Sequence, residues 1–182
     1  GAPTASIGPV PLWTAPPFER LEVGEKTGQN PTDRGKPGSK HHLVTDANGI
    51  PLAAILTGAN THDVTQLVPL IDAIPRVRGK RSRPRHRPDE VYADRAYDSE
   101  PHREALREIG TEPFIAKRST EHGSGLGTRR WVVERTLAWL SKYRAIQTRY
   151  EVKPENYAGL LKFACVLIWT RNWHRIKLDT TD

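Results

Sequence analysis

Two carboxylates, Asp94 and Glu134, are the side chains of this sequence best suited to catalysis. Asp94 ends the short apolar run EVYAD (90–94), and Glu134 lies in the helical pattern RRWVVERTLAWL, four residues after Arg130. A carboxylate at a strand end and a second one on a helix can hold divalent metal ions, and such sites cut and join phosphodiester bonds. In this interpretation both carboxylates are metal ligands and Arg130 contacts a phosphate group.

Each of these residues also has an ordinary structural interpretation. Asp94 begins the polar sequence DRAYDS and can simply cap the next turn. Glu134 and Arg130 can form a surface ion pair, which stabilises a helix by only about 0.2–0.5 kcal/mol. Ligands gather at the carboxyl ends of strands in α/β sheets, which favours the functional interpretation of Asp94. The residues alone leave both interpretations open.

Composition indicates a polyanionic partner. The chain has 182 residues, enough for one domain, and a net charge of +7. Cys165 is the only cysteine, which excludes a disulfide within the chain. There is no signal-peptide pattern, and the apolar run 160–169 contains Lys162 and is shorter than the roughly 20 residues that span a bilayer. We therefore expect a cytoplasmic protein without a membrane partner.

The positive charge is concentrated in the segment RVRGKRSRPRHRPDE (76–90). Such a run often forms only a solvated loop, but the overall charge also favours binding to phosphates. The predicted DNA contacts are Arg130, Lys40, Arg95, Arg76, Arg78, Lys80, Arg81, Arg83, Arg85 and Arg87.

Hydrophobic periodicity and turn residues predict an alternating order of elements. The dipeptide Asn48-Gly49 predicts a hairpin between two strands. Strands are also expected over 90–94 and 112–117, and helices over 63–74 with a kink at Pro69, over 99–109, from 128 onward, and over 155–176. This order predicts an α/β fold, a mixed sheet with helices on its faces.

Four segments in this order resemble the catalytic domain of bacterial insertion-sequence transposases of the DDE class, and in particular the insertion-sequence-five-like group. They are TGQNPTDRGKPGSKHHLVTDANGIPL, ANTHDVTQL, ADRAYDSEPHRE, and RRWVVERTLAWL followed by RYE (149–151). The resemblance implies an RNase H-like fold and a site of three carboxylates holding two Mg²⁺ ions, with Mn²⁺ as the alternative ion. It makes Asp94 the second catalytic Asp and Glu134 the catalytic Glu.

The resemblance also implies partners and a location. The partners would be double-stranded DNA at the terminal repeats of an insertion sequence, the target DNA, and a second copy or a full-length transposase, all at the bacterial nucleoid. Arg130 matches the arginine of the family pattern Tyr-x2-Arg-x3-Glu-x6-Lys. Gly127 and Ser141 stand at the Tyr and Lys positions of that pattern, so it is only partly present.

The sequence departs from the family at its first catalytic Asp, which lies shortly before the TGQNPTDRG segment. The corresponding region here, PLWTAPPFERLEV, contains no Asp. Trp is encoded only by TGG and Thr by ACN, so a shifted frame across Trp13 and Thr14 always reads GAC, an Asp codon. We therefore expect residues 1–23 to be an irregular, Pro-rich segment read out of frame, with its strand missing or replaced. The family domain would cover 24–177, and 178–182 would be a tail.

These observations predict DNA transposition, the cutting and joining of DNA at insertion-sequence ends. Without one of three carboxylates, the lone chain is expected to be inactive or nearly so. Two alternatives stay open: a truncated transposase that regulates by binding DNA without cutting it, and a non-functional remnant.

Overall fold

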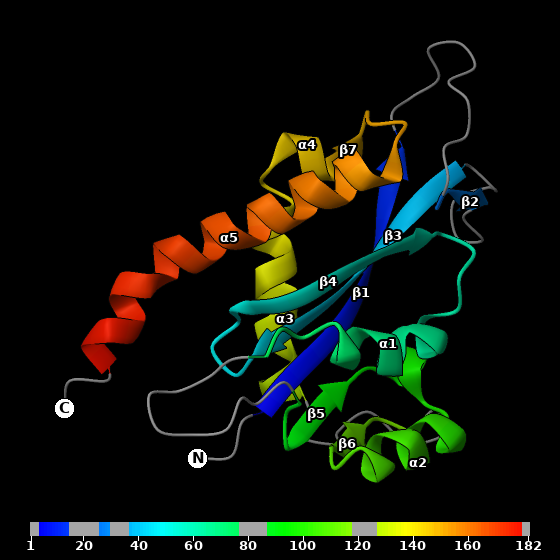
Figure 1. The fold of residues 1–182 in the computed structure, drawn as a ribbon, viewed down its shortest axis with the longest axis vertical. Coiled ribbons are helices and arrows are strands. Elements are labelled where there is room, and N and C mark those ends of the chain that lie inside the picture. Colours follow the sequence, from blue (N-terminus) through cyan, green and yellow to red (C-terminus); the bar gives the residue numbers. More distant parts are fainter. Residues whose placement is uncertain (1–3, 15–25, 30–36, 77–86, 118–126, 180–182) are drawn as a thin grey trace.

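A mixed sheet runs through the computed structural model, which describes residues 4–14, 26–29, 37–76, 87–117 and 127–179 (Figure 1). The strands are β1 (Thr4–Thr14), β2 (Gly28–Gln29), β3 (Pro37–Asp46), β4 (Pro51–Gly58), β5 (Glu90–Ala93), β6 (Glu112–Ile115) and β7 (Thr148–Arg149). The helices are η1 (Asp63–Gln66), α1 (Leu67–Asp72), η2 (Arg95–Tyr97), α2 (Glu100–Glu108), α3 (Gly127–Leu140), α4 (Arg144–Gln147) and α5 (Pro154–Asp179).

The main strands lie in the order β4-β3-β1-β5-β6. β4, β3 and β1 are successively antiparallel, whereas β1, β5 and β6 are parallel to one another. Three antiparallel strands followed by two parallel ones is the arrangement expected of an RNase H-like fold. The predicted α/β class is therefore confirmed.

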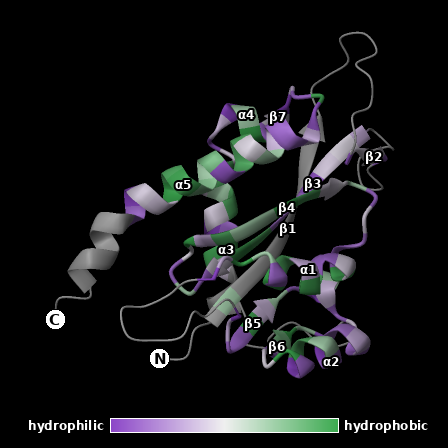
Figure 2. Cartoon of the chain, viewed as in Figure 1, coloured by the Kyte–Doolittle hydropathy of each residue, from purple (hydrophilic) through white to green (hydrophobic). Residues whose placement is uncertain are grey.

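The two faces of the sheet carry two separate cores. Because successive strand residues point to opposite faces, Val44 of β3 packs with α1 and α2, and its neighbour Leu43 packs with α3 and α5. Figure 1 shows α1 and α2 on one side of the strands and α3 on the other. Figure 2 shows apolar residues along much of α5, whereas the turns are mostly polar. Among the described residues, no helix is both long and apolar enough to cross a membrane.

Residues 4–14 differ from the expectation of an irregular segment, because they form β1 in the centre of the sheet. The two prolines explain how this is compatible with strand pairing. Pro9 and Pro11 are two residues apart, so their backbone nitrogens face the same side of the strand. The N–H groups that prolines lack therefore weaken hydrogen bonding along only one edge of β1. Pairing with β5 ends at Ile7, and pairing with β3 continues to Leu12. Residues 4–14 thus provide a strand in the centre of the sheet.

Locally encoded elements match the predictions closely. Asn48 and Gly49 form the β3–β4 turn, with Gly49 at φ 79° and the Asp46 carboxylate accepting from the N–H groups of Asn48 and Ile50. The predicted helix 63–74 is divided into η1 and α1, and Pro69 lies inside α1 without breaking it. Gly28 and Gln29 form the short strand β2, which pairs with the beginning of β3.

Candidate active site

Asp94 follows β5 directly and lies beside the central strand β1. The last pair in the β1–β5 register is Ile7 with Ala93, so Gly8 is the next residue of β1 toward Asp94. The Asp94 side chain caps η2, with Oδ1 accepting from the Arg95 N–H at 2.6 Å. The structural interpretation of Asp94 as a cap is therefore confirmed, and it coexists with a half-buried position at the carboxyl end of a strand.

The side chain of Asp94 belongs to the face of the sheet that α3 covers. Asp94 has an extended backbone, with φ −78° and ψ 166°, so the alternation of β5 continues through it. Ala93 is buried in the core under α1 and α2. The next side chain, that of Asp94, therefore projects to the opposite face.

Glu134 lies on this same side, on α3. The helix packs mainly over β1 and buries Val133, Thr136 and Leu140. On one flank, the Arg135 guanidinium donates to the Asn48 carbonyl at 2.7 Å, which fixes that flank toward the β3–β4 turn. Helical geometry places Glu134 on the other flank, exposed and toward the β5 side. The structure thus brings the two predicted carboxylates to the same side of the sheet.

The predicted DNA contacts have different surroundings. Arg130 lies in the first turn of α3, one helical turn from Glu134. The Lys40 ammonium is engaged inside the protein, 2.8 Å from Asp63 Oδ1 and 3.0 Å from the Thr61 carbonyl. Arg87 pairs with Asp72 at 3.2 Å, and Arg76 is exposed. The other predicted contacts on the basic segment lie outside the described residues: Arg78, Lys80, Arg81, Arg83 and Arg85.

A buried polar network that was not predicted from the sequence supports the turn that carries Asp94. The Tyr97 N–H donates to the Asp94 carbonyl at 2.9 Å, and the Tyr97 hydroxyl lies 3.3 Å from His42 Nδ1. The other ring nitrogen, His42 Nε2, lies 2.9 Å from Thr57 Oγ1. A tyrosine in a polar sequence directly after a strand is the signal that could have indicated a buried hydroxyl.

Burial decides the protonation states in this network. It raises the pKa of Tyr97 above its ordinary value, and the charges of Asp63 and Asp94 add to this. Burial lowers the pKa of His42 to about 4, although Asp63 opposes the shift. Tyr97 therefore keeps its hydroxyl proton and His42 is neutral, so one ring nitrogen of His42 donates a hydrogen bond and the other accepts one. These bonds tie the Asp94 turn to β3 and β4.

The turn is also held from its far end. The Asp98 carboxylate accepts from the Arg103 guanidinium at 2.7 Å. Arg103 is buried and donates to the Ile115 carbonyl of β6 at 2.8 Å. The segment from Asp94 to Asp98 is thus fixed to β3, α2 and β6, which suits a position that must hold a catalytic group.

The donor types at the site suit Mg²⁺ or Mn²⁺, because both ions prefer carboxylate oxygen. Asp94 and Glu134 supply two such groups, and β1 carries no Asp or Glu. Within the described residues, no three His, Cys, Asp or Glu side chains lie together in a way that could hold a metal ion. Asp94 and Glu134 are therefore candidate oxygen ligands.

The pattern of the transposase DDE domain family matches residues 13–169. This chain belongs to the transposase DDE domain family. Its functional class is accordingly DNA transposition, and the two carboxylates lie on elements that the match includes. The match begins within β1, a part that the sequence analysis placed outside the family domain.

Two relatives are insertion-sequence proteins. A putative transposase for insertion sequence element IS402 from Burkholderia cepacia is 66% identical over 143 residues, covering 79% of this chain and 68% of the relative. A transposase for insertion sequence element IS1106 from Neisseria meningitidis serogroup B is 29% identical over 137 residues, covering 70% of this chain and 42% of the relative. The transposase DDE domain described here thus spans only part of each relative.

The fold also resembles a solved structure. A chain in the cryo-EM structure of a simian T-cell lymphotropic virus intasome in complex with PP2A regulatory subunit B56 gamma gives a TM-score of 0.51 at 13% identity. The likeness covers 87% of this chain and 46% of that chain. At this identity it supports the RNase H-like fold alone.

Proposed function

We propose that this chain is the catalytic part of a DNA transposase and that it acts on double-stranded DNA, at the terminal repeats of an insertion sequence and at the target. The observation that carries the proposal is the placement of Asp94 and Glu134. Asp94 directly follows β5 and Glu134 lies on α3, which packs over the central strand β1. Family membership supports the same assignment.

In this proposal Asp94 and Glu134 together hold a divalent ion, Mg²⁺ or Mn²⁺. Such an ion activates the attacking oxygen and stabilises the departing one in phosphodiester chemistry. The chain's own contribution is to hold the two carboxylates in place. Tyr97, His42 and Arg103 fix the Asp94 turn. In this proposal Arg130, one helical turn from Glu134, contacts a phosphate.

The missing third carboxylate limits this activity. β1 is the central strand of the sheet, and the sequence of Thr4–Thr14 offers no acidic side chain. A site with two of three carboxylates binds its ions weakly. The lone chain is therefore expected to bind DNA and to cut or join it slowly at most.

Asp94→Asn and Glu134→Gln should each abolish metal binding at the site. With Fe²⁺ and ascorbate in place of Mg²⁺, radicals made at the bound ion cut the nearby backbone. We expect fragments ending near residues 94 and 134 in the unaltered chain and a loss of roughly tenfold or more in both variants. Glu108→Gln, an exposed carboxylate on α2, is the matched control. Fragments that persist in both variants would refute the assignment.

Gly8→Asp should strengthen metal binding, because residue 8 of β1 is next in register to Asp94. Gly8 pairs with Leu43, which packs under α3, so a side chain at residue 8 belongs to that face. A third carboxylate there should raise Mn²⁺ affinity by roughly tenfold, equivalent to about 1.4 kcal/mol. Isothermal titration with Mn²⁺ measures this. Gly8→Asn is the control for shape, and equal affinity of the Asp and Asn variants would contradict the proposed geometry.

The absence of a carboxylate from β1 also favours a second candidate, a regulator that occupies DNA without cutting it. It predicts binding in the presence of EDTA, with an affinity that falls steeply as salt rises because phosphate contacts release counterions. DNA binding without any cleavage, also in the Gly8→Asp variant, would favour this candidate over the catalytic one.

A further inference from the structure

An apolar groove of about 580 Å³ runs along β4, well away from the candidate active site. It touches six consecutive residues, Pro51 to Leu56. Consecutive strand side chains point to opposite faces, so a groove in contact with all six must follow the open edge of the strand. Among the described strands, β4 pairs only with β3, which leaves that edge free.

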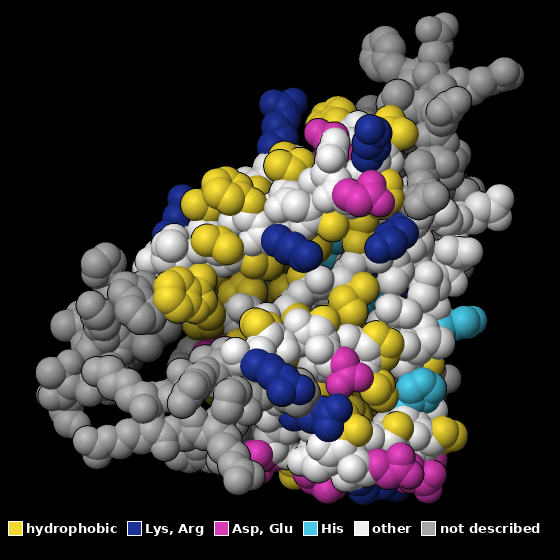
Figure 3. Space-filling view, in the orientation of Figure 1, with side chains coloured by type: hydrophobic (Ala, Val, Ile, Leu, Met, Phe, Trp, Pro, Cys, Tyr) yellow, Lys and Arg dark blue, Asp and Glu magenta, His cyan; other side chains and the backbone are white. Residues whose placement is uncertain are grey.

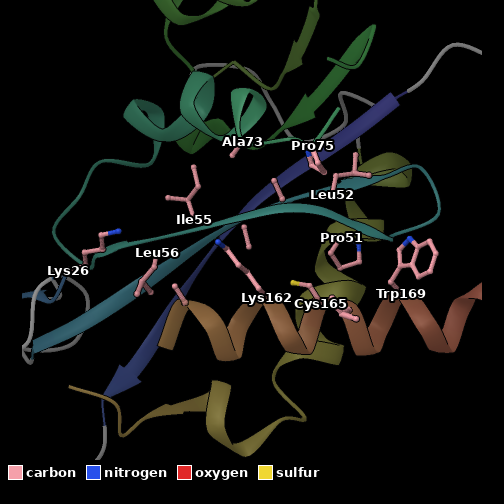
Figure 4. A pocket seen from close by; sticks show the side chains of 14 residues that line it. Lys26, Pro51, Leu52, Ile55, Leu56, Ala73, Pro75, Lys162, Cys165 and Trp169 are labelled. Carbon is pink, nitrogen blue, oxygen red and sulfur yellow. The ribbon is translucent and has the colours of Figure 1, made fainter. Parts of the chain in front are cut away.

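The groove has a wall on each face of the sheet. Ala73 and Pro75, after α1, form one wall, and Cys165, Val166 and Trp169 of α5 belong to the other (Figure 4). Figure 3 shows the apolar hollow between these two parts of the surface. A strand added to β4 would be covered on both faces, so it must be apolar on both faces. β4 itself has this character, with five successive apolar residues from Leu52 to Leu56.

The flank of α5 that faces the groove carries both charged and exposed apolar side chains. Helical geometry places Glu155 on the same flank as Lys162, seven residues later, and Lys162, Val166 and Trp169 all line the groove. Val166 and Trp169 are 53% and 42% exposed, which is unusual for apolar side chains on one flank of a helix. Ala158 and Gly159 lie halfway between Glu155 and Lys162, and an added Cβ on Gly159 would meet no atom within 4 Å.

We propose that this groove is the surface on which a second copy of the chain docks, with the β4 edges paired antiparallel around a two-fold axis. The same rotation sets the two α5 helices antiparallel. When the axis passes between Ala158 and Gly159, Glu155 of each copy lies opposite Lys162 of the other. The dimer then has two ion pairs between opposite charges. A single rotation thus pairs the two open strand edges and forms both ion pairs, as an isologous interface requires.

This dimer leaves the candidate active site accessible. β3 and β1 separate β4 from β5, so Asp94 lies across the sheet from the interface. The proposal is independent of the catalytic assignment and stands or falls on the oligomeric state. An acidic, apolar peptide from another protein is the competing occupant, since Lys26 and Lys162 are the charged residues that line the groove among those the structure describes.

Sedimentation equilibrium over a range of protein concentrations tests the proposal. We expect a monomer–dimer equilibrium, and Val166→Glu should raise the dimer dissociation constant by roughly tenfold or more. Phe163→Glu is the matched control, because Phe163 is 61% exposed on the same helix but does not line the groove. A chain that stays monomeric at every concentration, or a dimer that Val166→Glu does not weaken, would overturn the proposal. A monomer would favour the acidic, apolar peptide as the occupant of the groove.

Charge exchange provides the second measurement. Glu155→Lys and Lys162→Glu should each weaken the dimer, whereas the double variant should return to within about twofold of the unaltered affinity, because opposite charges again face each other. Cys165 lines the groove and is the chain's only cysteine, so its alkylation should slow as the dimer forms. A double variant weaker than both single variants would contradict the antiparallel arrangement.

Discussion

Mild acid should unfold this transposase DDE domain, and two adjacent histidines are expected to be the main cause. His41 and His42 of β3 are buried, at 2% and 0% exposure. Burial, together with the nearby charges of His42 and Arg149, lowers the pKa of His41 to about 3. Burial also lowers the pKa of His42 to about 4. Both side chains are therefore neutral in the folded protein.

The sign of the effect follows from proton binding. In the unfolded chain both histidines take up protons below their ordinary pKa of 6.5, whereas the folded chain does not until pH 4 or 3. The stability they contribute is fully present above pH 6.5 and is lost as the pH falls toward 4, by about 1.4 kcal/mol per pH unit for each group. The loss at pH 4.5 is roughly 5 kcal/mol, which approaches the total stability of an ordinary domain.

Urea denaturation at pH 7.5, 6.5, 5.5 and 4.5 measures this loss. His41→Leu should remove about half of the pH dependence, and it also removes the His41 Nε2 atom, which is buried without a hydrogen-bond partner. His62→Gln is the matched control, because His62 is exposed. Asp46 opposes the trend at the acid end, since burial raises its pKa above the ordinary value. A urea midpoint unchanged between pH 7.5 and 5.5 would exclude the histidines as the cause.

The parts of the fold that were predicted correctly are those encoded by neighbouring residues. Asn48 and Gly49 tolerate the backbone of a tight turn, and the hairpin is where they predict it. Asp94 lies at a strand end because the apolar run before it pairs with β1. The same logic failed for residues 4–14, where Pro9 and Pro11 argue against a strand. Pairing with β3, a segment distant in sequence, overrides that local preference.

The supports of the site could not be predicted because they join distant residues. His42 and Tyr97 are 55 residues apart, and neither has a spacing that indicates contact. Lys40 was expected to face DNA, but its partner Asp63 becomes its neighbour only when β4 returns beside β3. The out-of-frame origin of residues 1–23 stays a prediction. The nucleotide sequence of the gene tests it, through an overlapping frame that encodes the missing Asp.

Arg149 is another residue whose importance only the structure reveals, and its loss should be among the most destabilising single changes. It is buried to 8% exposure and joins three parts of the chain. Its guanidinium donates to Ser39 Oγ at 2.5 Å, to Thr27 Oγ1 at 3.1 Å, and to the carbonyls of Glu151 and Val152 at 2.8 and 3.0 Å. It also lies 5.4 Å from the centre of the Tyr157 ring.

Arg149→Ala leaves these acceptors unpaired in the interior and removes the packing on Tyr157. We expect a loss of roughly 3–4 kcal/mol in the free energy of unfolding, measured by urea denaturation at pH 7.5. Arg149→Lys should recover little of it, because an ammonium group lacks the planar fork that reaches several acceptors at once. Arg144→Ala, an exposed arginine on α4, should change the stability by less than about 0.5 kcal/mol.

Amide hydrogen exchange distinguishes a local role of Arg149 from a global one. Thr27 precedes β2, and Ser39 belongs to β3. The Arg149 guanidinium therefore holds Thr27 and Ser39 against β7 and the beginning of α5. In Arg149→Lys, the amides of Thr27 to Gln29 should exchange faster than those of α2, which Arg149 does not contact. Uniform acceleration across the chain would mean that Arg149 contributes only to overall stability. A lysine variant as stable as the unaltered chain would show that the charge alone, without the fork, holds the segment.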